Sequence, residues 1–266
     1  MCRMLAYVGP PLRVGRLMRE AEHSLERQSY APRHMLTGRV NADGFGFAWY
    51  PEEGGEPARY RSLLPIWADP NLSDLGRTLR SGILLAAVRG ATVPGSTGYA
   101  DTQPFASGRL LFLHNGFIES FHTKVMRRLR AELSDEVYGS LRGSSDSETL
   151  FGLFRTLCSD PSTPCGLARG LVRTVERAGE LCEAAGVQAL ITFLVANGEA
   201  VVGLRAAVGA PEAPSLFLHH GGSHFPGAAL LASEPLEGEA SEWSAVAPGR
   251  PVVLRHTEEG AEVELL

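Results

Sequence analysis

The order of strand-like and helix-like segments constrains the fold of this chain more than any other feature of its sequence. Short apolar or alternating stretches bounded by Gly, Pro and Asn predict strands at residues 5–8, 45–50, 83–88, 110–113, 189–195, 201–205, 216–218 and 252–254. Helical periodicity is clearest at residues 12–28, 121–133, 147–157 and 166–185. The strands gather before and after the helices. This order favours an α+β fold of mainly antiparallel sheets with helices packed on them, and it argues against a doubly wound parallel sheet.

Turn and loop signals refine this picture. Asn197-Gly198, between two predicted strands, predicts a hairpin turn, and Ser120 is a candidate helix cap. Residues 51–57, 93–104 and 219–227 have loop composition, and none of these loops is long enough to be a flexible linker. With no repeat and no low-complexity tract, residues 1–266 are predicted to form a single domain.

Charge and hydropathy exclude two classes of partner. The chain has 25 Lys and Arg against 30 Asp and Glu, and its longest basic run is the Arg127-Arg128 pair, so nucleic acid is not an expected partner. The longest largely apolar runs, at 83–88 and 189–196, are far too short to span a membrane. The first 20 residues hold four arginines and no apolar signal-peptide core. We therefore expect a cytoplasmic protein.

The four cysteines predict no metal site. They stand at positions 2, 158, 165 and 182, without a C-x-x-C pair or a histidine spaced to complete a zinc site. Cys158, Cys165 and Cys182 fall in apolar or helical stretches where a free cysteine is ordinary, so we interpret them as structural.

Cys2 differs because of its position. A small second residue allows removal of the initiator Met1, and Cys2 would then become the first residue. A terminal cysteine carries a nucleophilic thiol beside its own α-amine, whose pKa of about 7.7 to 8.0 suits a general base near neutral pH. Cysteine also occurs at position 2 by chance in many cytosolic proteins, so the catalytic interpretation needs support from other motifs.

Four further fragments have the residue types that such chemistry needs. Gly44 and Gly46 lie where a turn enters an aromatic strand. Arg89 ends an apolar strand, where a guanidinium either clamps a carboxylate or pairs with a neighbouring acidic side chain. Asn115-Gly116 closes another strand, and the pair is either an everyday turn or an amide and an N–H group that together hold an oxyanion.

The fourth fragment opens a helix. Ser145 and Glu148 have the spacing of a capping box, which is the structural interpretation of this segment. Asp146, in the same first turn, has a carboxylate that could receive a ligand ammonium group. Capping and binding are compatible here.

Together, these fragments resemble the class II glutamine amidotransferases, a branch of the N-terminal-nucleophile hydrolases. The resemblance rests on the ordered series of Cys2, D-G-F-G at 43–46, R-G-A-T at 89–92, H-N-G at 114–116 and S-D-S-E at 145–148. It implies a four-layer αββα sandwich of two mainly antiparallel sheets, with no metal or organic cofactor. It also implies that Cys2 is the nucleophile attacking a γ-glutamyl amide, and that Asn115 and the N–H of Gly116 form the oxyanion hole.

The resemblance also implies the residues that bind substrate. Arg89 would hold the α-carboxylate of the glutamyl group, Thr92 would line the same pocket, and Asp146 would bind the α-ammonium. The chain departs from the family pattern at Gln103, where many members have the histidine of an N-x-H-P-F segment, and at Val93, which replaces a histidine after the arginine motif. We expect the remaining nearby histidine, His114, to be structural.

A narrower resemblance points to one subfamily. Residues 1–3, 5–11, 28–33, 40–46, 65–67 and 232–236 resemble the amidohydrolases of ergothioneine biosynthesis, which remove glutamate from γ-glutamyl-hercynylcysteine sulfoxide. This small γ-glutamyl substrate is therefore the expected partner. Tyr30, Trp67 and Tyr99 are candidates for a hercynyl pocket or for plain packing.

Two alternatives stay open at this point. One is a glutaminase subunit that supplies ammonia to a separate synthase chain, and the other is a non-catalytic descendant that binds a γ-glutamyl ligand. The intact series of site residues argues against the second.

Overall fold

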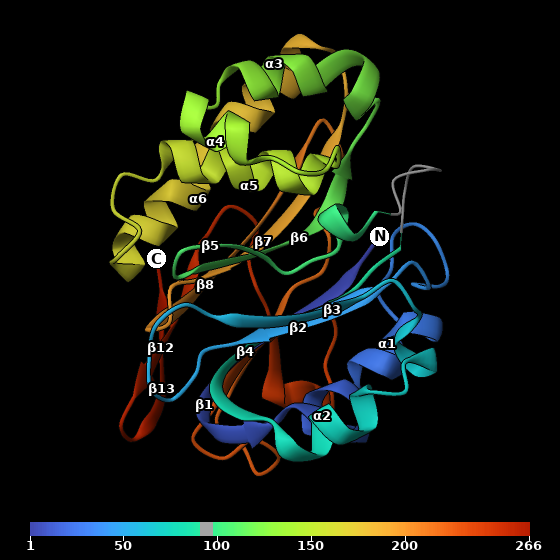
Figure 1. Cartoon of the computed structure of the whole chain (residues 1–266), viewed down its shortest axis with the longest axis vertical. Helices are drawn as coiled ribbons and strands as arrows, with labels where there is room; N and C mark the ends of the chain where they lie inside the picture. The colour runs from blue at the N-terminus through green and yellow to red at the C-terminus, as the bar shows by residue number, and fades with distance from the viewer. Residues whose placement is uncertain (91–97) are drawn as a thin grey trace.

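Four layers make up the structure, a computed structural model that describes residues 1–90 and 98–266. Figure 1 shows them edge on, with α3 to α6 in one outer layer, α1 and α2 in the other, and two sheets between. The predicted α+β class and the αββα sandwich are confirmed. In the described residues, no helix combines the length and the apolar character needed to cross a membrane.

Both sheets are antiparallel at every described strand pair. The strands of the first sheet are β1 (Arg3–Arg13), β2 (Phe45–Trp49), β3 (Ala58–Ser62), β4 (Arg80–Val88), β9 (Phe217–His220), β10 (Ala229–Ala232) and β11 (Trp243–Ala245). Those of the second are β5 (Phe105–Ser107), β6 (Leu110–Ile118), β7 (Ala189–Ala196), β8 (Ala200–Val208), β12 (Val252–Thr257) and β13 (Gly260–Leu265). Their orders are β11-β9-β10-β1-β4-β2-β3 and β13-β12-β8-β7-β6-β5.

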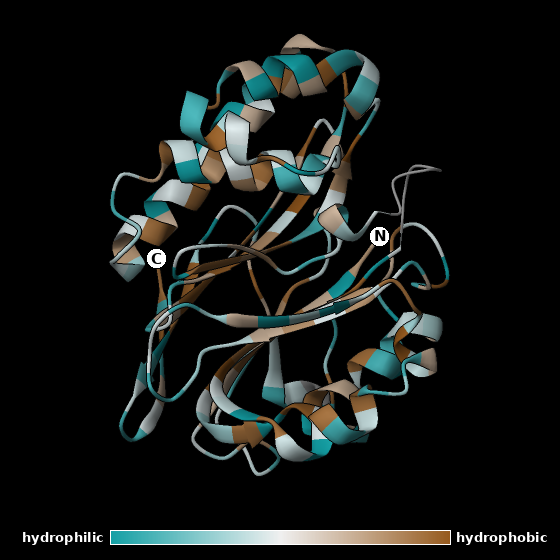
Figure 2. Cartoon of the chain, in the orientation of Figure 1, coloured by the Kyte–Doolittle hydropathy of each residue, from teal (hydrophilic) through white to brown (hydrophobic). Residues whose placement is uncertain are grey.

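The helices cover the two outer faces. They are α1 (Leu25–Tyr30), α2 (Leu72–Thr78), α3 (Met126–Ala131), α4 (Asp135–Ser140), α5 (Asp146–Leu157) and α6 (Pro164–Ala184). Shorter helical turns are η1 (Arg16–Glu20), η2 (Ile66–Ala68), η3 (Tyr99–Asp101), η4 (Phe121–Val125) and η5 (Ala240–Glu242). Figure 2 shows hydrophobic and hydrophilic residues alternating along the outer helices, as expected for helices that bury one face.

Strand alternation separates the apolar core into three parts. In β1, Met4, Ala6 and Val8 belong to the cluster between the two sheets, whereas Leu5 and Tyr7 belong to the cluster under the first helical layer. A third cluster lies between the second sheet and helices α3, α5 and α6. Because side chains alternate along a strand, residues an even number of positions before Met4 also point between the sheets. Cys2, which immediately precedes β1 and lies two positions before Met4, is therefore directed into the space between the sheets.

One predicted helix is wrong. Residues 12–28 do not form a continuous helix, because β1 continues to Arg13, which pairs with Arg80 of β4. The π-helical turn η1 follows, and α1 begins only after Ser24, whose side chain accepts a hydrogen bond from the N–H of Arg27. Strand pairing with a distant segment has overridden the local helical periodicity.

Residues 121–133 are helical in two pieces, η4 and α3. Ser120 does not cap them with its side chain, since it has a left-handed φ of 50° and its hydroxyl makes no capping hydrogen bond. Its carbonyl instead accepts from Thr123 and Lys124. The other two predicted helices correspond to α5 and α6, and the hairpin turn at Asn197-Gly198 is confirmed between β7 and β8.

Candidate active site

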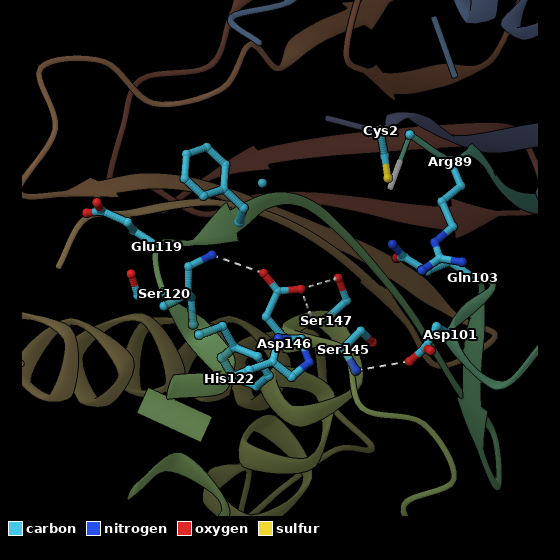
Figure 3. Close-up of a pocket in the computed structure, with 15 residues that line it drawn as sticks. Cys2, Arg89, Asp101, Gln103, Glu119, Ser120, His122, Ser145, Asp146 and Ser147 are labelled. Carbon is cyan, nitrogen blue, oxygen red and sulfur yellow. Dashed lines mark hydrogen bonds between the residues drawn. The ribbon is translucent and has the colours of Figure 1, made fainter. Parts of the chain in front are cut away.

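A cavity of about 240 Å³ opens at the beginning of β1 and collects most of the residues singled out from the sequence. Cys2, Arg89, Gly116 and Asp146 all line it. Figure 3 shows Cys2 and Arg89 entering from the side of the first sheet and Asp146 from the opposite wall. Thr92 and Val93 lie outside the described residues. Four segments far apart in the sequence therefore meet at one site.

Cys2 is held by the residues on either side of it. It immediately precedes β1, and the Nε of Arg3 donates a hydrogen bond of 2.8 Å to the Cys2 carbonyl. The ammonium group of Met1 donates to the carbonyl of Thr37. Burial lowers the pKa of this ammonium group from its usual value of 8.0.

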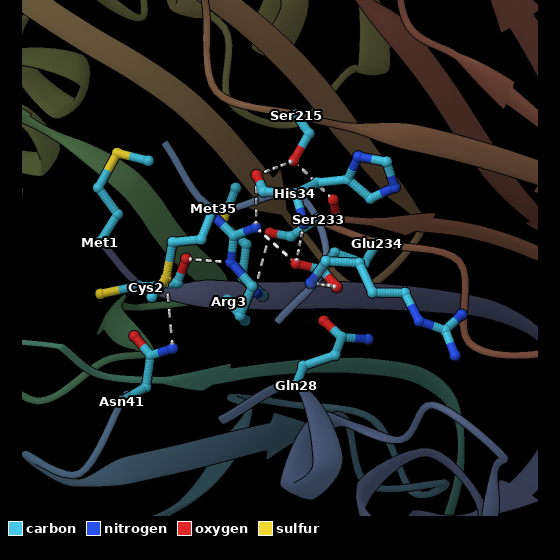
Figure 4. Close-up of polar contacts among 12 residues, drawn as sticks. Met1, Cys2, Arg3, Gln28, His34, Met35, Asn41, Ser215, Ser233 and Glu234 are labelled. Atoms are coloured by element: carbon cyan, nitrogen blue, oxygen red, sulfur yellow. Dashed lines mark hydrogen bonds and ion pairs between the residues drawn. The ribbon is translucent and has the colours of Figure 1, made fainter. Parts of the chain in front are cut away.

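A buried ion pair anchors the beginning of β1 (Figure 4). The Arg3 guanidinium and the Glu234 carboxylate are both fully buried, and Arg3 Nη1 lies 2.9 Å from Glu234 Oε1. Glu234 also contacts His23 Nε2 at 2.6 Å and accepts from the N–H groups of Arg33 and His34. Hydrogen bonds satisfy both oxygens of Glu234, whereas Arg3 Nη2 is buried without a hydrogen-bond partner among the described residues. The network fixes Arg3, and through Arg3 the backbone of the preceding residue.

These partners favour the ionised form of Glu234. Burial by itself would raise the pKa of the carboxyl, but the hydrogen bonds from His23, His34 and Arg33, together with the charge of Arg3, lower it to about 2. The usual value for the side chain is 4.5. A pKa lowered on folding stabilises the folded state above the unfolded-state pKa, and the stabilisation is lost as the pH falls through the folded-state pKa.

We therefore expect Glu234→Gln to lower the free energy of unfolding by roughly 3 to 4 kcal/mol at pH 7, because the pKa falls by about 2.5 on folding and each pKa unit corresponds to ~1.4 kcal/mol. The wild-type chain should lose this increment between pH 4.5 and about 2, whereas the variant should lack that part of the pH dependence. Urea unfolding across this range measures both. Glu264→Gln, which breaks the exposed pair with Arg255, is the matched control and should change stability by less than about 1 kcal/mol. Equal pH dependence in wild type and Glu234→Gln would contradict the assignment.

Arg89 is positioned by the segment that carries the D-G-F-G motif. It directly follows β4, its N–H donates to the Gly44 carbonyl at 2.8 Å, and its carbonyl accepts from the Asp43 N–H at 3.0 Å. The side chain is 8% exposed and lines the cavity. The D-G-F-G segment thus fixes the backbone of Arg89. The Arg89 guanidinium provides a cation at the cavity.

The backbone of β6 directs one N–H group into the cavity. Along a strand, the N–H groups of residues two apart point to the same side. The His114 N–H donates to Gln103 Oε1 at 2.6 Å, and Gln103 Nε2 donates back to the His114 carbonyl at 2.8 Å. The Ile118 N–H donates to Asp146 at 3.0 Å. The N–H of Gly116 lies between these two and points to the same side, where Gly116 lines the cavity.

Asn115 precedes Gly116 on β6, but it is not among the residues that line the cavity. Its side chain is fully buried, and neither Nδ2 nor Oδ1 has a hydrogen-bond partner among the described residues. A buried amide without a partner costs free energy, and such groups are rare unless a ligand completes the bond. The Asn115 amide and the Gly116 N–H together have the composition of an oxyanion hole.

Asp146 is the first residue of α5, and three groups already hold its carboxylate. Oδ2 accepts from the Ile118 N–H at 3.0 Å, and Oδ1 accepts from the N–H of Ser147 at 2.7 Å and from its hydroxyl at 3.3 Å. A carboxylate has about four acceptor positions, so one position is left for a ligand. The helix N-terminus further stabilises its negative charge.

The predicted capping box is only half formed. Ser145 caps α5 by accepting from the Glu148 N–H, as expected. Glu148 does not return the bond, because its carboxylate accepts from the N–H groups of Arg142 and Gly143. The Ser145 N–H donates instead to Asp101 at 3.0 Å. Asp101, which the sequence analysis did not single out, thus fixes the start of the helix that carries Asp146.

The aromatic candidates for a hercynyl pocket lie outside the cavity. Tyr30 and Trp67 pack edge to face with ring centroids 6.0 Å apart, and Tyr99 stacks on the guanidinium of Arg61. His114 points toward α5, where its Nδ1 lies 2.9 Å from the Ser147 hydroxyl, and burial lowers its pKa. Tyr30, Trp67 and Tyr99 are exposed side chains, whereas His114 is buried.

The comparison with protein families identifies the family of the chain. The family model of the class II glutamine amidotransferases matches residues 16–208, which include Arg89, Asn115, Gly116 and Asp146. The chain belongs to this family. A probable glutamine amidotransferase of Saccharomyces cerevisiae is 32% identical over 92% of this chain and 79% of its own length.

Other known proteins match this chain over different lengths. The γ-glutamyl-hercynylcysteine sulfoxide hydrolase of Mycobacterium tuberculosis is 40% identical over 119 residues, which are 45% of this chain and 50% of the hydrolase. A class II domain protein of Silicibacter pomeroyi superposes with a TM-score of 0.70 at 26% identity, covering 99% of this chain and 98% of that structure. The phosphoribosylpyrophosphate amidotransferase of Bacillus subtilis, at 17% identity and a TM-score of 0.64, shares the fold; the match covers 99% of this chain and 49% of that enzyme.

Proposed function

We propose that the protein is an N-terminal-cysteine amidohydrolase that cleaves a γ-glutamyl amide and releases glutamate. The observation that supports this most is the convergence of a thiol, a guanidinium, a carboxylate and a backbone N–H on one cavity, from Cys2, Arg89, Asp146 and Gly116. A glutamyl group is a zwitterion with a reactive amide at its far end. One cation, one anion and one nucleophile are the groups that recognise and cleave it.

The reaction begins with the thiol of Cys2 after Met1 has been removed. The α-amine of Cys2 accepts the thiol proton, and the sulfur attacks the γ-carbonyl carbon to form a C–S bond. The amine proton then passes to the leaving nitrogen as the C–N bond breaks, which leaves a thioester. Water attacks the thioester with the same amine as base, and glutamate and the free thiol are formed.

Charge develops on the carbonyl oxygen in each addition step. In our mechanism, the Nδ2 of Asn115 and the N–H of Gly116 donate to this oxygen, and Arg89 and Asp146 fix the two charged ends of the glutamyl group. The Asn115 amide has no hydrogen-bond partner among the described residues, and this supports its assignment as a donor to the developing oxyanion.

Asn115→Ala tests the oxyanion assignment. We expect kcat to fall by roughly 10² to 10³, with a much smaller change in KM, because the lost bond forms mainly in the transition state. The free energy of unfolding should change by less than about 1 kcal/mol, since the amide makes no protein hydrogen bond that the substitution would break. Steady-state kinetics and urea unfolding measure these quantities. A large loss of stability with unchanged kcat would assign Asn115 a structural role instead.

For the leaving group, we propose hercynylcysteine sulfoxide, so that the enzyme would act in ergothioneine biosynthesis in the cytoplasm. The similarity to the mycobacterial hydrolases, which extends over 45% of this chain, supports this substrate. The second candidate is a glutaminase that supplies ammonia to a separate synthase chain. The similarity to a probable glutamine amidotransferase over 92% of this chain favours that alternative.

Glutamate release from the two substrates distinguishes these functions. Purified protein whose N-terminus has been checked by mass spectrometry is assayed in parallel with γ-glutamyl-hercynylcysteine sulfoxide and with glutamine. We expect a kcat/KM for the sulfoxide at least about tenfold above that for glutamine. A preference for glutamine would favour the glutaminase alternative. Absence of turnover on both substrates, from a chain that begins at Cys2, would contradict the proposed hydrolysis.

A further inference from the structure

A second cavity, of about 290 Å³, is lined by four arginines. It lies where β3 and β5, the edge strands of the two sheets, meet α4, α5 and the segment between these helices. The basic side chains come from three segments that are distant in the sequence, and they are Arg59, Arg61, Arg142 and Arg155. Tyr99 and Phe151 provide aromatic walls.

The positive charge in this cavity is not balanced. Within residues 1–90 and 98–266, none of the four arginines forms a salt bridge. Glu148 lines the cavity, but its oxygens accept from the backbone N–H groups of Arg142 and Gly143. Burial, and then the charge of Arg61, lower the pKa of Arg59, which is the direction expected for cations crowded together. One carboxylate among four guanidinium groups leaves an excess of positive charge.

Most of the guanidinium donors remain available. Arg59 donates one hydrogen bond to the Pro104 carbonyl, and Arg155 donates one to the Ser140 hydroxyl. Arg61 donates to two backbone carbonyls and stacks on Tyr99. The side chain of Arg142 makes no hydrogen bond to a described residue. Each guanidinium has five N–H groups in a planar fork that matches the oxygens of phosphate and carboxylate.

This second cavity, the arginine cavity, is separate from the cavity lined by Cys2, the catalytic cavity. Asp101 stands between them, and its Oδ1 accepts from the N–H groups of Ser144 and Ser145. Asp101 and Ser145 line the catalytic cavity, whereas Ala100 and Arg142 line the arginine cavity. A molecule in the arginine cavity would therefore be a second ligand rather than an extension of the glutamyl substrate.

We propose that the arginine cavity binds a multiply charged small-molecule anion, one that bears a phosphate group or several carboxylates. At least two guanidinium forks are needed to balance such a charge, and the cavity offers four. One wall is β3, which carries Arg59 and Arg61. The other is formed by α5 and the segment before it, which carry Arg155 and Arg142, so the anion would contact guanidinium groups of both walls. This inference does not depend on the proposed hydrolysis.

Isothermal titration calorimetry with inorganic phosphate and with citrate tests the site. We use the Cys2→Ala chain in a buffer of low ionic strength that contains no multivalent anion, with excess glutamine present. We expect saturable binding of one anion per chain by at least one probe, and weaker binding as salt is added. Preference for phosphate or for citrate identifies the anionic group. Failure of both probes to bind saturably, or displacement by glutamine, would overturn the proposal.

Two double variants locate the anion. Arg142→Gln with Arg155→Gln should weaken binding by about tenfold or more, because two charge-assisted contacts are lost. Arg127→Gln with Arg128→Gln removes the same charge from the exposed side of α3 and should change affinity by less than about twofold. Equal weakening by the two double variants would indicate nonspecific attraction and contradict the site. The single variant Arg142→Gln, at a side chain without protein hydrogen bonds, repeats the test without structural disturbance.

Discussion

Cys2→Ala is expected to lower turnover of a γ-glutamyl amide by at least about a thousandfold. The substitution removes the sulfur that forms the thioester, and no other described cysteine lines the catalytic cavity. Alanine is also small, so removal of Met1 and the position of the terminal amine are retained. Glutamate release measured at saturating substrate gives the result directly.

Cys165→Ala is the matched control for this prediction. Cys165 is exposed on α6 and contributes nothing to the cavity. Its replacement should leave turnover within about twofold of the wild-type value. Retained turnover in Cys2→Ala would exclude Cys2 as the nucleophile, and equal losses in both variants would indicate a general effect of removing a thiol.

Gly116→Ala is expected to lower the free energy of unfolding by about 3 kcal/mol or more and to abolish turnover. A Cβ atom at this position would lie 1.8 Å from the Leu190 carbonyl oxygen on β7 and 2.9 Å from His114 Nε2. The backbone has a φ of 151°, which L side chains rarely adopt. The chain must therefore shift β6 away from β7, and this shift moves the N–H group assigned to the oxyanion hole.

Gly139→Ala provides the comparison. Gly139 lies in α4, and no atom lies within 4 Å of the position its Cβ would take. Alanine is favoured over glycine in a helix by roughly 0.5 to 1 kcal/mol, so stability should stay equal or rise slightly. Urea unfolding of both variants separates a local collision from a general effect of substituting glycine. Wild-type stability in Gly116→Ala would contradict the strand geometry described here.

Short sequence patterns predict those strands whose burial is visible in their own residues. All eight predicted strands correspond to observed ones, because apolar runs bounded by turn residues reflect burial on a sheet. The edge strand β3 (Ala58–Ser62) was missed because its sequence A-R-Y-R-S has little apolar signal. β5 and β11 have only three residues each, too few for a pattern. Helix propensity likewise failed at residues 12–28, where pairing of Arg13 with Arg80 extends β1.

The candidate site shows the same difference between residues that local motifs predict and residues that depend on distant partners. The candidate site residues occur in recognisable motifs, and four of them line one cavity. The residues that hold them were not predicted, because their partners are distant in the sequence. Arg3 pairs with Glu234 across 231 positions, and Asp101 reaches Ser145 across 44. Gln103 was noted only as a departure from the family pattern, although its amide fixes both backbone groups of His114.

Covalent labelling with an electrophilic glutamine analogue, such as a diazo ketone, followed by mass spectrometry of the N-terminal peptide, tests the proposed nucleophile most directly. The mechanism predicts one label per chain, on the Sγ of Cys2, in a peptide that begins at Cys2. It also predicts that excess glutamine protects the thiol and that chains retaining Met1 stay unlabelled. A label on another residue, or labelling of Cys2 in chains that retain Met1, would contradict the central claim that Cys2 and its own amine perform the reaction.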